Sequence, residues 1–489
     1  VQLRPMYEYL IGIDPATGKR EAQLATEWSI SPDGKAYTFK LRSGVRYHGD
    51  NGELTSKDVS KAFWDIVQPD SIHGSSKYWL ALVDRVDDSN PLTAVLYLKK
   101  PDAQAIGNIS AQLTGIELKS TKQYDALGHT PTLQEGPLAG TGPYQYKERR
   151  QGEYIRFERV PYQHWRQQAA FPELEIRFIR EASTRLAGLL TGEIHMTPLP
   201  EDLLAQAQKS SMQVVKGTVP GVRAFLQFRG AYLADRKNPT SGWKYPNSPL
   251  TDVRVRRALA KAVNLDELNK TLLAGKGEPL YLNHYNQRRA GWSDDWVKRF
   301  PDEYGYDPAK AKELLAQAGY GPNNPLKTTI VMVQLAELPQ SQDILEAAAG
   351  YWRAVGAQVT LITPDRTQDG QKTNALEYDN AITIFTAPSD QYLGIQIFNV
   401  YTGAFAGSNV DIPQVDDIYL NKVLPEPNDA KRGQYLTELG NAMFDSHQHI
   451  PLFWVPVQVA YDPRIVSQYV FPGSTSGLYT HLEGVKAAR

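Results

Sequence analysis

Aromatic side chains beside glycine and proline are the residues of this sequence whose type and placement best suit ligand contact. The chain has 27 Tyr and 9 Trp among its 489 residues. Several of them fall in segments that the local sequence predicts to be loops: Trp243, Tyr245, Tyr281, Tyr285, Trp292, Trp296 and Tyr392. Aromatic rings in loops beside a cleft can stack on sugars or receive the side chains of peptides. Each ring alone is more often packed in a core, but together they favour a roomy binding cleft.

Sequence patterns of common enzymes are absent from the chain. It has no Gly-x-Ser-x-Gly elbow, no phosphate-binding Gly-x-x-x-x-Gly-Lys-Ser/Thr, no His-Glu-x-x-His and no dinucleotide fingerprint after a strand. His447 and His449 are the one closely spaced His pair, and near a predicted helix end they would diverge, which favours a surface or capping role. The adjacent acids Asp294–Asp295 and Asp416–Asp417 do not face each other on a helix, so we expect solvated or capping residues.

Two further patterns could be mistaken for anion sites. The segment 140–144, Gly-Thr-Gly-Pro-Tyr, is rich in glycine, but no helix with an exposed N-terminus follows it, so a structural turn is favoured over a phosphate loop. Arg254, Arg256 and Arg257 alternate with apolar residues on one predicted helix. A solvated helix face is therefore favoured over a nucleic-acid patch.

Composition restricts the class of protein. Hydrophobic residues make up 41% and charged residues 22%, with 53 Lys plus Arg against 54 Asp plus Glu and a formal net charge of -1. This balance gives no reason to expect nucleic acid as a partner. The chain has no cysteine, which excludes disulfides, thiolate metal sites and cysteine nucleophiles. We expect no cofactor. The length predicts two or three structural units.

The clearest local signal is a predicted helix over 250–268. Asp252 is a plausible N-cap, and Val255, Leu259 and Val263 recur four residues apart as a core-facing stripe. The arginines of this helix are expected at the surface.

The elements expected around this helix differ on its two sides. In the first third of the chain, the alternating residues and turn signals predict hairpins, including one at 28–42 and one around Gly152. Beyond residue 306, predicted helices at 309–318 and 340–355 alternate with strands at 327–333, 358–362 and 380–386. That alternation favours an α/β lobe with a partly parallel sheet.

Several motifs occur in an order that matches one family. They are Glu27–His48 (Glu-Trp-Ser-Ile-Ser-Pro-Asp-Gly-Lys through Gly-Val-Arg-Tyr-His), Leu54–Val59, Gly140–Tyr144, Ala182–Ala187 with Thr191–Glu193, Asp252–Leu259, Tyr306–Leu315 with Ala318–Tyr320, and Ile450–Phe453. In this order the chain resembles the bacterial extracellular solute-binding proteins of family 5, which include dipeptide-, oligopeptide- and nickel-binding components of ABC importers. Each motif alone is weak, but together they span almost the whole chain.

The resemblance implies an α/β bilobal periplasmic-binding-protein fold, type II and cluster C-like, with an extra inserted α+β domain. Lobe I would comprise residues 1–26, 163–251 and 457–489, the inserted domain residues 27–162, and lobe II residues 252–456. Hinge crossings would lie near Leu250 and Pro456, and closure of the lobes would bury the ligand.

Two departures from the family pattern bear on the site. The usual strand and Leu-Asp-Pro segment before Met6–Leu10 is missing, so we expect that the chain begins late relative to the family pattern. In peptide-binding members an aspartate after the strand matching 380–386 pairs with the ligand's amino terminus, whereas here that strand continues into Phe385-Thr-Ala-Pro388. The aspartate is either displaced to Asp390 or absent.

The resulting hypothesis is a non-enzymatic, periplasmic or extracellular protein that captures a peptide-like solute and delivers it to an ABC permease. We expect a monomer. Membrane anchoring through a segment outside this chain is left open. Asp390 would pair an ammonium, Arg223 or Arg229 would receive a carboxylate or phosphate, and Trp243 with Tyr245 would form a lid-like element. The predicted ligand-binding set is Tyr7, Arg223, Arg229, Trp243, Tyr245, Phe385, Thr386, Ala387, Pro388, Ser389, Asp390, Tyr392 and Gln396.

Three alternatives remain open at this stage: a binder of oligosaccharides or sugar conjugates with the same fold, a hydrolase of such solutes, and a cytoplasmic sensor domain fused to a regulator. A hydrolase would turn its solute over, whereas a binding protein returns it intact.

Overall fold

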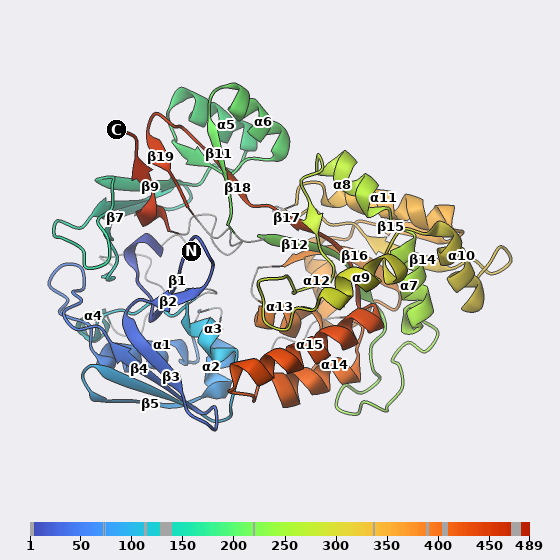
Figure 1. The fold of residues 1–489 in the computed structure, drawn as a ribbon, viewed down its shortest axis with the longest axis horizontal. Coiled ribbons are helices and arrows are strands. Elements are labelled where there is room, and N and C mark those ends of the chain that lie inside the picture. The colour runs from blue at the N-terminus through green and yellow to red at the C-terminus, as the bar shows by residue number, and fades with distance from the viewer. Residues whose placement is uncertain are drawn as a thin grey trace. The chain divides into compact units, whose positions relative to one another are not determined.

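The chain folds into two compact units. The computed structural model describes residues 4–71, 73, 75–111, 115–127, 139–218, 221–335, 338–387, 391–402, 409–470 and 481–489. Unit 1 comprises Val1–Val219, Pro425–Pro427 and Val457–Arg489, and unit 2 comprises Pro220–Leu424 and Asn428–Pro456 (Figure 1). The three-part division expected from the sequence differs from these two units. It separates an inserted domain within unit 1 and assigns residues 220–251 to the first lobe, and it stays a prediction.

Unit 1 is built mainly from small antiparallel sheets. Their orders are β1-β2, β3-β4-β6-β5, β7-β8-β9, β10-β18-β11 and β19-β20. The strands are β1 (Ile11–Ile13), β2 (Arg20–Ala22), β3 (Ala25–Ile30), β4 (Ala36–Leu41), β5 (Val83–Asn90), β6 (Thr93–Leu98), β7 (Tyr144–Arg150), β8 (Tyr154–Arg159), β9 (Glu173–Arg177), β10 (Met196–Thr197), β11 (Gln213–Lys216), β18 (Gln458–Tyr461), β19 (Val466–Gln468) and β20 (Lys486–Ala487). The helices are α1 (Ser56–Ile66), α2 (Ser76–Leu82), α3 (Ala105–Ile109), α4 (Thr121–Leu127), α5 (Ala182–Thr191) and α6 (Glu201–Lys209), with 3₁₀ turns at Arg4–Met6 and Leu482–Gly484.

The hairpins expected in the first third are confirmed. β3 pairs with β4, and β7 pairs with β8, both antiparallel. Between β3 and β4 the amide of Gly34 donates to the carbonyl of Ser31 at 2.8 Å, which closes the predicted turn.

The glycine-rich segment 140–144 has the structural role predicted for it. A Cβ at Gly140 would lie 1.8 Å from the carbonyl oxygen of Met6, and a Cβ at Gly142 would lie 2.7 Å from that of Pro5. The amide of Gly142 donates to the Met6 carbonyl at 3.0 Å. Glycine is therefore required because the two backbone segments are in direct contact.

Replacing Gly140 by alanine should destabilise unit 1 strongly. The added methyl group would overlap backbone atoms that cannot swing away, so we expect a loss of at least about 2 kcal/mol in the free energy of unfolding. Chemical denaturation followed by circular dichroism measures this. Gly484→Ala is the matched control, because a Cβ there meets nothing within 4 Å; equal losses in the two variants would refute the contact.

Unit 2 is an α/β layer structure around one mixed sheet of order β13-β17-β12-β16-β14-β15. Its strands are β12 (Val222–Arg229), β13 (Glu278–Pro279), β14 (Lys327–Val331), β15 (Gln358–Ile362), β16 (Ala381–Ala387) and β17 (His449–Val455). Its helices are α7 (Val253–Lys261), α8 (Leu265–Leu272), α9 (Asp294–Glu303), α10 (Pro308–Gln317), α11 (Ser341–Ala354), α12 (Arg366–Asn374), α13 (Gln391–Phe398), α14 (Pro413–Ile418) and α15 (Asp429–Ser446), with a 3₁₀ turn at Pro249–Thr251 and a π-helical turn at Tyr419–Val423. β14 runs parallel to β15 and β16, whereas β12 is antiparallel to β16 and β17. The predicted partly parallel sheet is confirmed.

The single helix predicted over 250–268 is two helices. α7 ends at Lys261 and α8 begins at Leu265, where the side chain of Asn264 accepts a hydrogen bond from the amide of Glu267 and caps α8. Asp252 caps α7 as predicted, and Val255, Leu259 and Val263 lie in the main core of the unit. The apolar spacing continued through the break because both helices pack on that core.

The expected surface position of the arginines of this segment is wrong for Arg256, and the nearby Lys261 is buried as well. Arg256 is buried and donates to the carbonyls of Ser446 and His447 at the C-terminus of α15. It also donates to the carbonyl of Leu250, which precedes α7. Lys261 is buried too and donates to the carbonyls of Pro301, Asp302 and Gly305 around the end of α9. Unpaired carbonyls at helix ends attract such cations.

Two other sequence expectations need correction. The surface role expected for His447 and His449 is wrong, since both are buried, although His447 does cap α15 in a left-handed conformation. Asp294 and Asp295 are exposed as expected, but Asp416 is buried and accepts hydrogen bonds from the amides of Tyr401 and Thr402. Within the described ranges, no helix combines the length and the apolar character needed to cross a membrane.

Candidate functional site

Strand β12 of unit 2 places charged side chains inside the molecule. Its alternate residues Ala224, Leu226 and Phe228 enter the main core. The opposite face carries Arg223, Phe225, Gln227 and Arg229, whose exposed fractions are 0%, 0%, 3% and 1%. Charged groups in a central strand are costly unless the surroundings stabilise them, so this face is a candidate for function.

Arg223 lies at the start of this face between two neighbouring strands. Its cross-strand neighbours are Ala387 on β16 and Trp454 on β17. The Arg223 guanidinium is 5.7 Å from the centre of the Trp454 ring, and the guanidinium of Arg289 is 5.5 Å from the same ring. Two cations therefore share one buried indole, an arrangement that the ring quadrupole favours.

Helix α13 packs directly on Arg223 through Gly394. A Cβ at this glycine would lie 2.4 Å from Nη2 of Arg223 and 2.4 Å from Nδ1 of His284. Glycine at this position lets the helix backbone approach both side chains, so Gly394 positions the guanidinium.

The histidines beside Arg223 add no positive charge at neutral pH. Burial, together with Arg223, His449 and Arg289, holds the pKa of His284 well below its usual value. Burial, with Arg223 contributing, lowers the pKa of His449 to about 3. The positive potential of this cluster therefore comes from the two arginines and suits a carboxylate or another anion.

An aromatic group adjoins the arginines on the same face of the sheet. The ring centre of Phe225 lies 6.4 Å from that of Phe385, 5.1 Å from that of Phe398 and 4.9 Å from that of His449. Basic and aromatic surfaces thus lie side by side, a combination suited to a solute with an acidic group and an apolar part. We call Arg223, Arg289, Trp454, Phe225 and Phe385 the Arg223 cluster.

Several sequence-predicted residues come together at this cluster. Phe385 and Thr386 lie opposite Phe225 and Ala224, Ala387 lies opposite Arg223, and Gln396 is buried on α13. Pro388, Ser389 and Asp390 lie outside the described residues.

The remaining predicted residues of unit 2 lie elsewhere. Arg229 is at the other end of β12, about 20 Å along the strand from Arg223, and it pairs with Asp369 at 2.9 Å. The hydroxyl of Tyr245 donates to the carbonyl of Leu376, and Trp243 packs against the main core. The hydroxyl of Tyr392 accepts from Nε of Arg432 on α15. A ligand role for these residues stays a prediction.

Sequence reasoning did not include His284, Arg289, Gly394 and Trp454 in the site. No local pattern marks them, because their neighbourhood depends on the register of β12 against β17 and on the packing of α13. The one available signal was the pair of basic residues in a largely apolar strand, Arg223 and Arg229, both of which were in the predicted set.

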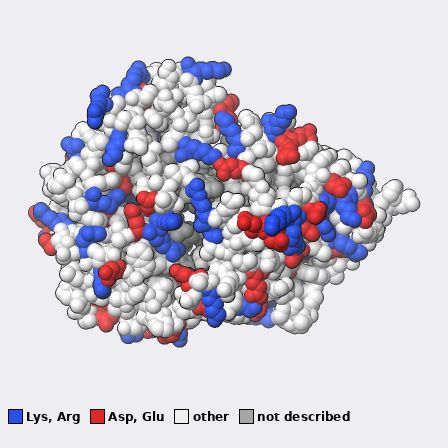
Figure 2. Space-filling model, in the orientation of Figure 1, with Lys and Arg blue, Asp and Glu red and all other residues white. Residues whose placement is uncertain are grey.

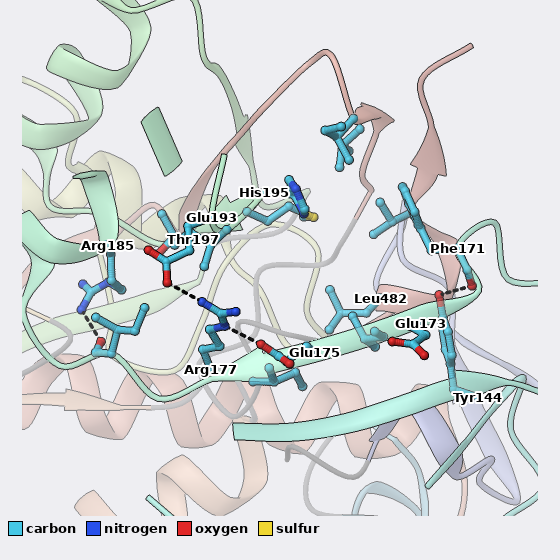
Figure 3. A pocket seen from close by; sticks show the side chains of 18 residues that line it. Tyr144, Phe171, Glu173, Glu175, Arg177, Arg185, Glu193, His195, Thr197 and Leu482 are labelled. Atoms are coloured by element: carbon cyan, nitrogen blue, oxygen red, sulfur yellow. Dashed lines mark hydrogen bonds and ion pairs between the residues drawn. The ribbon is translucent and has the colours of Figure 1, made fainter. Parts of the chain in front are cut away.

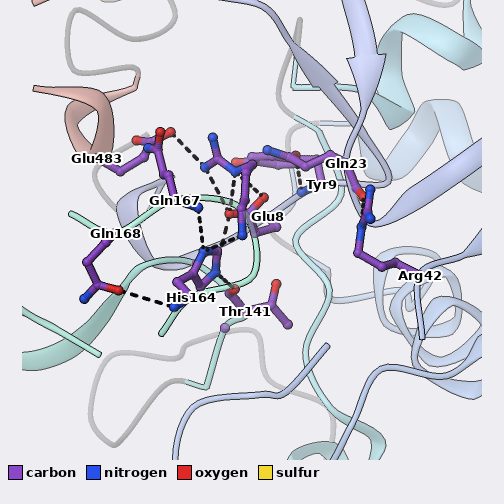
Figure 4. A network of polar contacts seen from close by, with 12 residues as sticks. Glu8, Tyr9, Gln23, Arg42, Thr141, His164, Gln167, Gln168 and Glu483 are labelled. Atoms are coloured by element: carbon purple, nitrogen blue, oxygen red, sulfur yellow. Dashed lines mark hydrogen bonds and ion pairs between the residues drawn. The ribbon is translucent and has the colours of Figure 1, made fainter. Parts of the chain in front are cut away.

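Tyr7, the remaining predicted residue, is buried in unit 1 next to an ion cluster. Glu8 accepts hydrogen bonds from Nε of Arg166 at 3.0 and 3.1 Å, and Nη2 of Arg166 also donates to Glu483 at 3.1 Å (Figure 4). His164 lies 3.8 Å from Glu8. This cluster joins the chain start, the segment after β8 and the C-terminal turn, which is a structural role.

The two acids of this cluster respond to pH in opposite directions. Burial, opposed by Arg166, raises the pKa of Glu8 to about 7, whereas His481 and Arg166 outweigh burial and lower the pKa of Glu483 to about 2. Because folded Glu8 holds its proton more tightly than the unfolded chain does, its contribution to stability is complete below about pH 4.5 and is lost as pH rises through 7.

Glu8→Gln should therefore abolish the part of the wild type's loss of folding stability that occurs as pH rises through 7. Relative to the wild type, the variant should gain on the order of 2 kcal/mol in free energy of unfolding between pH 4.5 and 8. Urea denaturation at both pH values measures this. Glu483→Gln should show its relative change below pH 4.5 instead, and parallel pH profiles for Glu8→Gln and the wild type would contradict the assignment.

Comparison with known proteins places the chain in a family. The family described as bacterial extracellular solute-binding proteins, family 5 (middle region) matches residues 19–402. The dipeptide-binding protein of Escherichia coli (strain K12) is 27% identical over 393 residues, which are 75% of this chain and 69% of that protein. The heme-binding protein A of Haemophilus influenzae is 26% identical over 404 residues, which are 75% of this chain and 67% of that protein.

Solved structures confirm the fold. HbpA2 from Haemophilus parasuis has a TM-score of 0.79 at 21% identity, covering 99% of this chain and 94% of that one. NikA from Brucella suis, solved in complex with Fe(III)-EDTA, has a TM-score of 0.78 at 20% identity, with the same coverage. The mixed α/β architecture is thus that of periplasmic binding proteins, as expected. Since the family match extends over most of the sequence, the chain belongs to the bacterial extracellular solute-binding proteins, family 5.

Proposed function

We propose that this protein captures a peptide-like solute outside the cytoplasm and delivers it to the permease of an ABC importer. The relatives that support this include the dipeptide-binding protein of Escherichia coli, di/tripeptide-binding proteins of Pseudomonas aeruginosa and a probable ABC transporter periplasmic-binding protein of Escherichia coli. In this proposal the passage of the chain between the two units at Pro456–Val457 forms part of the hinge for closure around the solute.

The observation that carries the proposal is the Arg223 cluster. Two guanidinium groups around the Trp454 ring create a positive site that receives the carboxylate of the solute. Phe385, which is only partly buried and packs on Phe225, offers an apolar surface beside it for a side chain of the same solute. A peptide with a free C-terminus carries both features.

Isothermal titration with matched peptides tests this proposal. Each peptide is offered with a free C-terminal carboxylate and as the C-terminal amide, which differs by one charge. We expect the carboxylate form to bind at least about tenfold more tightly, because one charge-assisted hydrogen bond contributes about 1.5–3 kcal/mol. Equal affinity of the two forms would refute carboxylate recognition, and no binding of any peptide would refute the peptide class.

Oligosaccharides or sugar conjugates remain the second candidate for the solute. The partly buried aromatic ring of Phe385 favours it, since sugar faces stack on such rings. An acidic sugar could also pair with Arg223. The same titration with an oligosaccharide that carries a carboxylate separates the two classes, because the proposal expects tighter binding of the peptide.

A further inference from the structure

Unit 1 contains a cavity that is separate from the Arg223 cluster. Its volume is about 360 Å³, within the range of about 300–1,000 Å³ typical of small-molecule sites. It lies between β9, the segment 193–197 after α5, and the C-terminal segments around β19 and the turn Leu482–Gly484. All lining residues belong to unit 1, whereas Arg223 belongs to unit 2.

The cavity wall is largely apolar and comes from several segments distant in sequence. Phe171 precedes β9, Ile176 is on β9, Met196 is on β10, and Leu482 and Val485 lie near the C-terminus. In Figure 3, Phe171 and Leu482 lie toward one end of the cavity with Glu173 beside them, whereas Arg177, Arg185 and Glu193 lie toward the other. Segments distant in sequence thus contribute apolar side chains to one cavity.

Charged residues of the wall are engaged in ion pairs or in hydrogen bonds to backbone carbonyls. Arg177 pairs with Glu175 and, at 2.6 Å, with Glu193 (Figure 3). Glu173 pairs with Lys147. Arg185 donates to the carbonyls of Pro198, Ile179 and Arg180. A charged ligand would have to displace these interactions, so the wall favours an uncharged one.

One apolar side chain of the cavity lining reaches the solvent. Ile465 lines the cavity and is 37% exposed. Ile465 therefore lies at the solvent-exposed edge of the cavity.

From the cavity, its largely apolar lining and its engaged charges, we propose that unit 1 holds a second ligand site, for an uncharged and mainly apolar small molecule such as an aromatic or branched aliphatic compound. The ligand contacts Phe171, Met196 and Leu482, and its edge covers Ile465. The site does not depend on the proposed capture of peptides, since the two sets of residues are separate.

Fluorescence titration with N-phenyl-1-naphthylamine, an uncharged aromatic probe, tests the site on the whole protein. We expect saturable binding at one probe per protein. Ile465→Asp places a charge at the exposed edge without disturbing a buried residue and should raise the Kd for the probe at least about tenfold. Met196→Trp should fill the cavity and abolish binding.

Matched controls separate the site from general surface hydrophobicity. Leu80→Asp changes another exposed apolar residue of unit 1, 53% exposed on α2, and should leave the Kd unchanged. Arg223→Gln should leave it unchanged too, so that failure of the peptide proposal and failure of this one are distinguishable. Non-saturable binding, or equal effects of Ile465→Asp and Leu80→Asp, would overturn the proposal; circular dichroism confirms that each variant is folded.

Discussion

Arg223→Gln is expected to weaken binding of a free-carboxylate peptide by roughly 100-fold, since loss of one partner of a buried charge pair costs about 2–5 kcal/mol. The reason is the position of Arg223 on β12, fully buried between Trp454 and α13. The C-terminal amide of the same peptide should lose much less affinity, because it lacks the charge that the guanidinium would pair with. Isothermal titration of both peptide forms against both proteins measures the coupling between the side chain and the carboxylate.

Two control variants sharpen this experiment. Arg254→Gln removes an exposed arginine of the same unit and should leave affinity for both peptide forms unchanged. Gly394→Ala keeps Arg223 but displaces it, because the added Cβ would lie 2.4 Å from its Nη2, and should also weaken binding of the carboxylate form. If Arg223→Gln affects the carboxylate and amide forms equally, the carboxylate does not bind at Arg223.

Arg256→Met is expected to lower the free energy of unfolding of unit 2 by about 3 kcal/mol, since buried groups left without hydrogen-bond partners cost about 1–3 kcal/mol each. Arg256 binds the carbonyls of Leu250, Ser446 and His447, and methionine leaves them unpaired while filling a similar volume. Burial lowers the pKa of Arg256 to about 10, so the side chain remains charged at neutral pH. Urea denaturation monitored by tryptophan fluorescence measures the loss.

Arg254→Met is the matched control on the same helix. Arg254 is exposed and pairs mainly with its neighbour Asp252, and exposed ion pairs contribute about 0–1 kcal/mol. If the two variants lose the same stability, Arg256 does not hold the end of α15 in the way described.

The comparison of Arg254 with Arg256 shows what local sequence could and could not reveal. The spacing of Val255 and Leu259 predicted the core-facing helix α7 correctly, because that pattern depends only on the helix period. Val263 also enters the core but lies after the end of α7. The burial of Arg256 depends on carbonyls about 190 residues later in the chain. No local pattern contains that information, so a buried cap was mistaken for a surface charge.

The same distinction applies to the candidate site. Strand β16 and its residues Phe385–Ala387 were predicted from local pattern and family resemblance, and the structure brings them opposite Arg223 and Phe225. Sequence could not choose between Arg223 and Arg229, because both lie on one face of β12 and only the fold shows that Asp369 pairs with Arg229. Trp454 was missed because it meets Arg223 only through the register of β12 against β17.

Native mass spectrometry of the protein purified from its natural source tests the central claim, that it binds a solute without transforming it. The account predicts one small molecule bound per protein chain, with a mass consistent with a carboxylate-bearing peptide, and the same mass recovered after prolonged incubation and denaturation. Recovery of cleavage products in place of that molecule would show a hydrolase, and a bound molecule without a carboxylate would contradict the role assigned to Arg223.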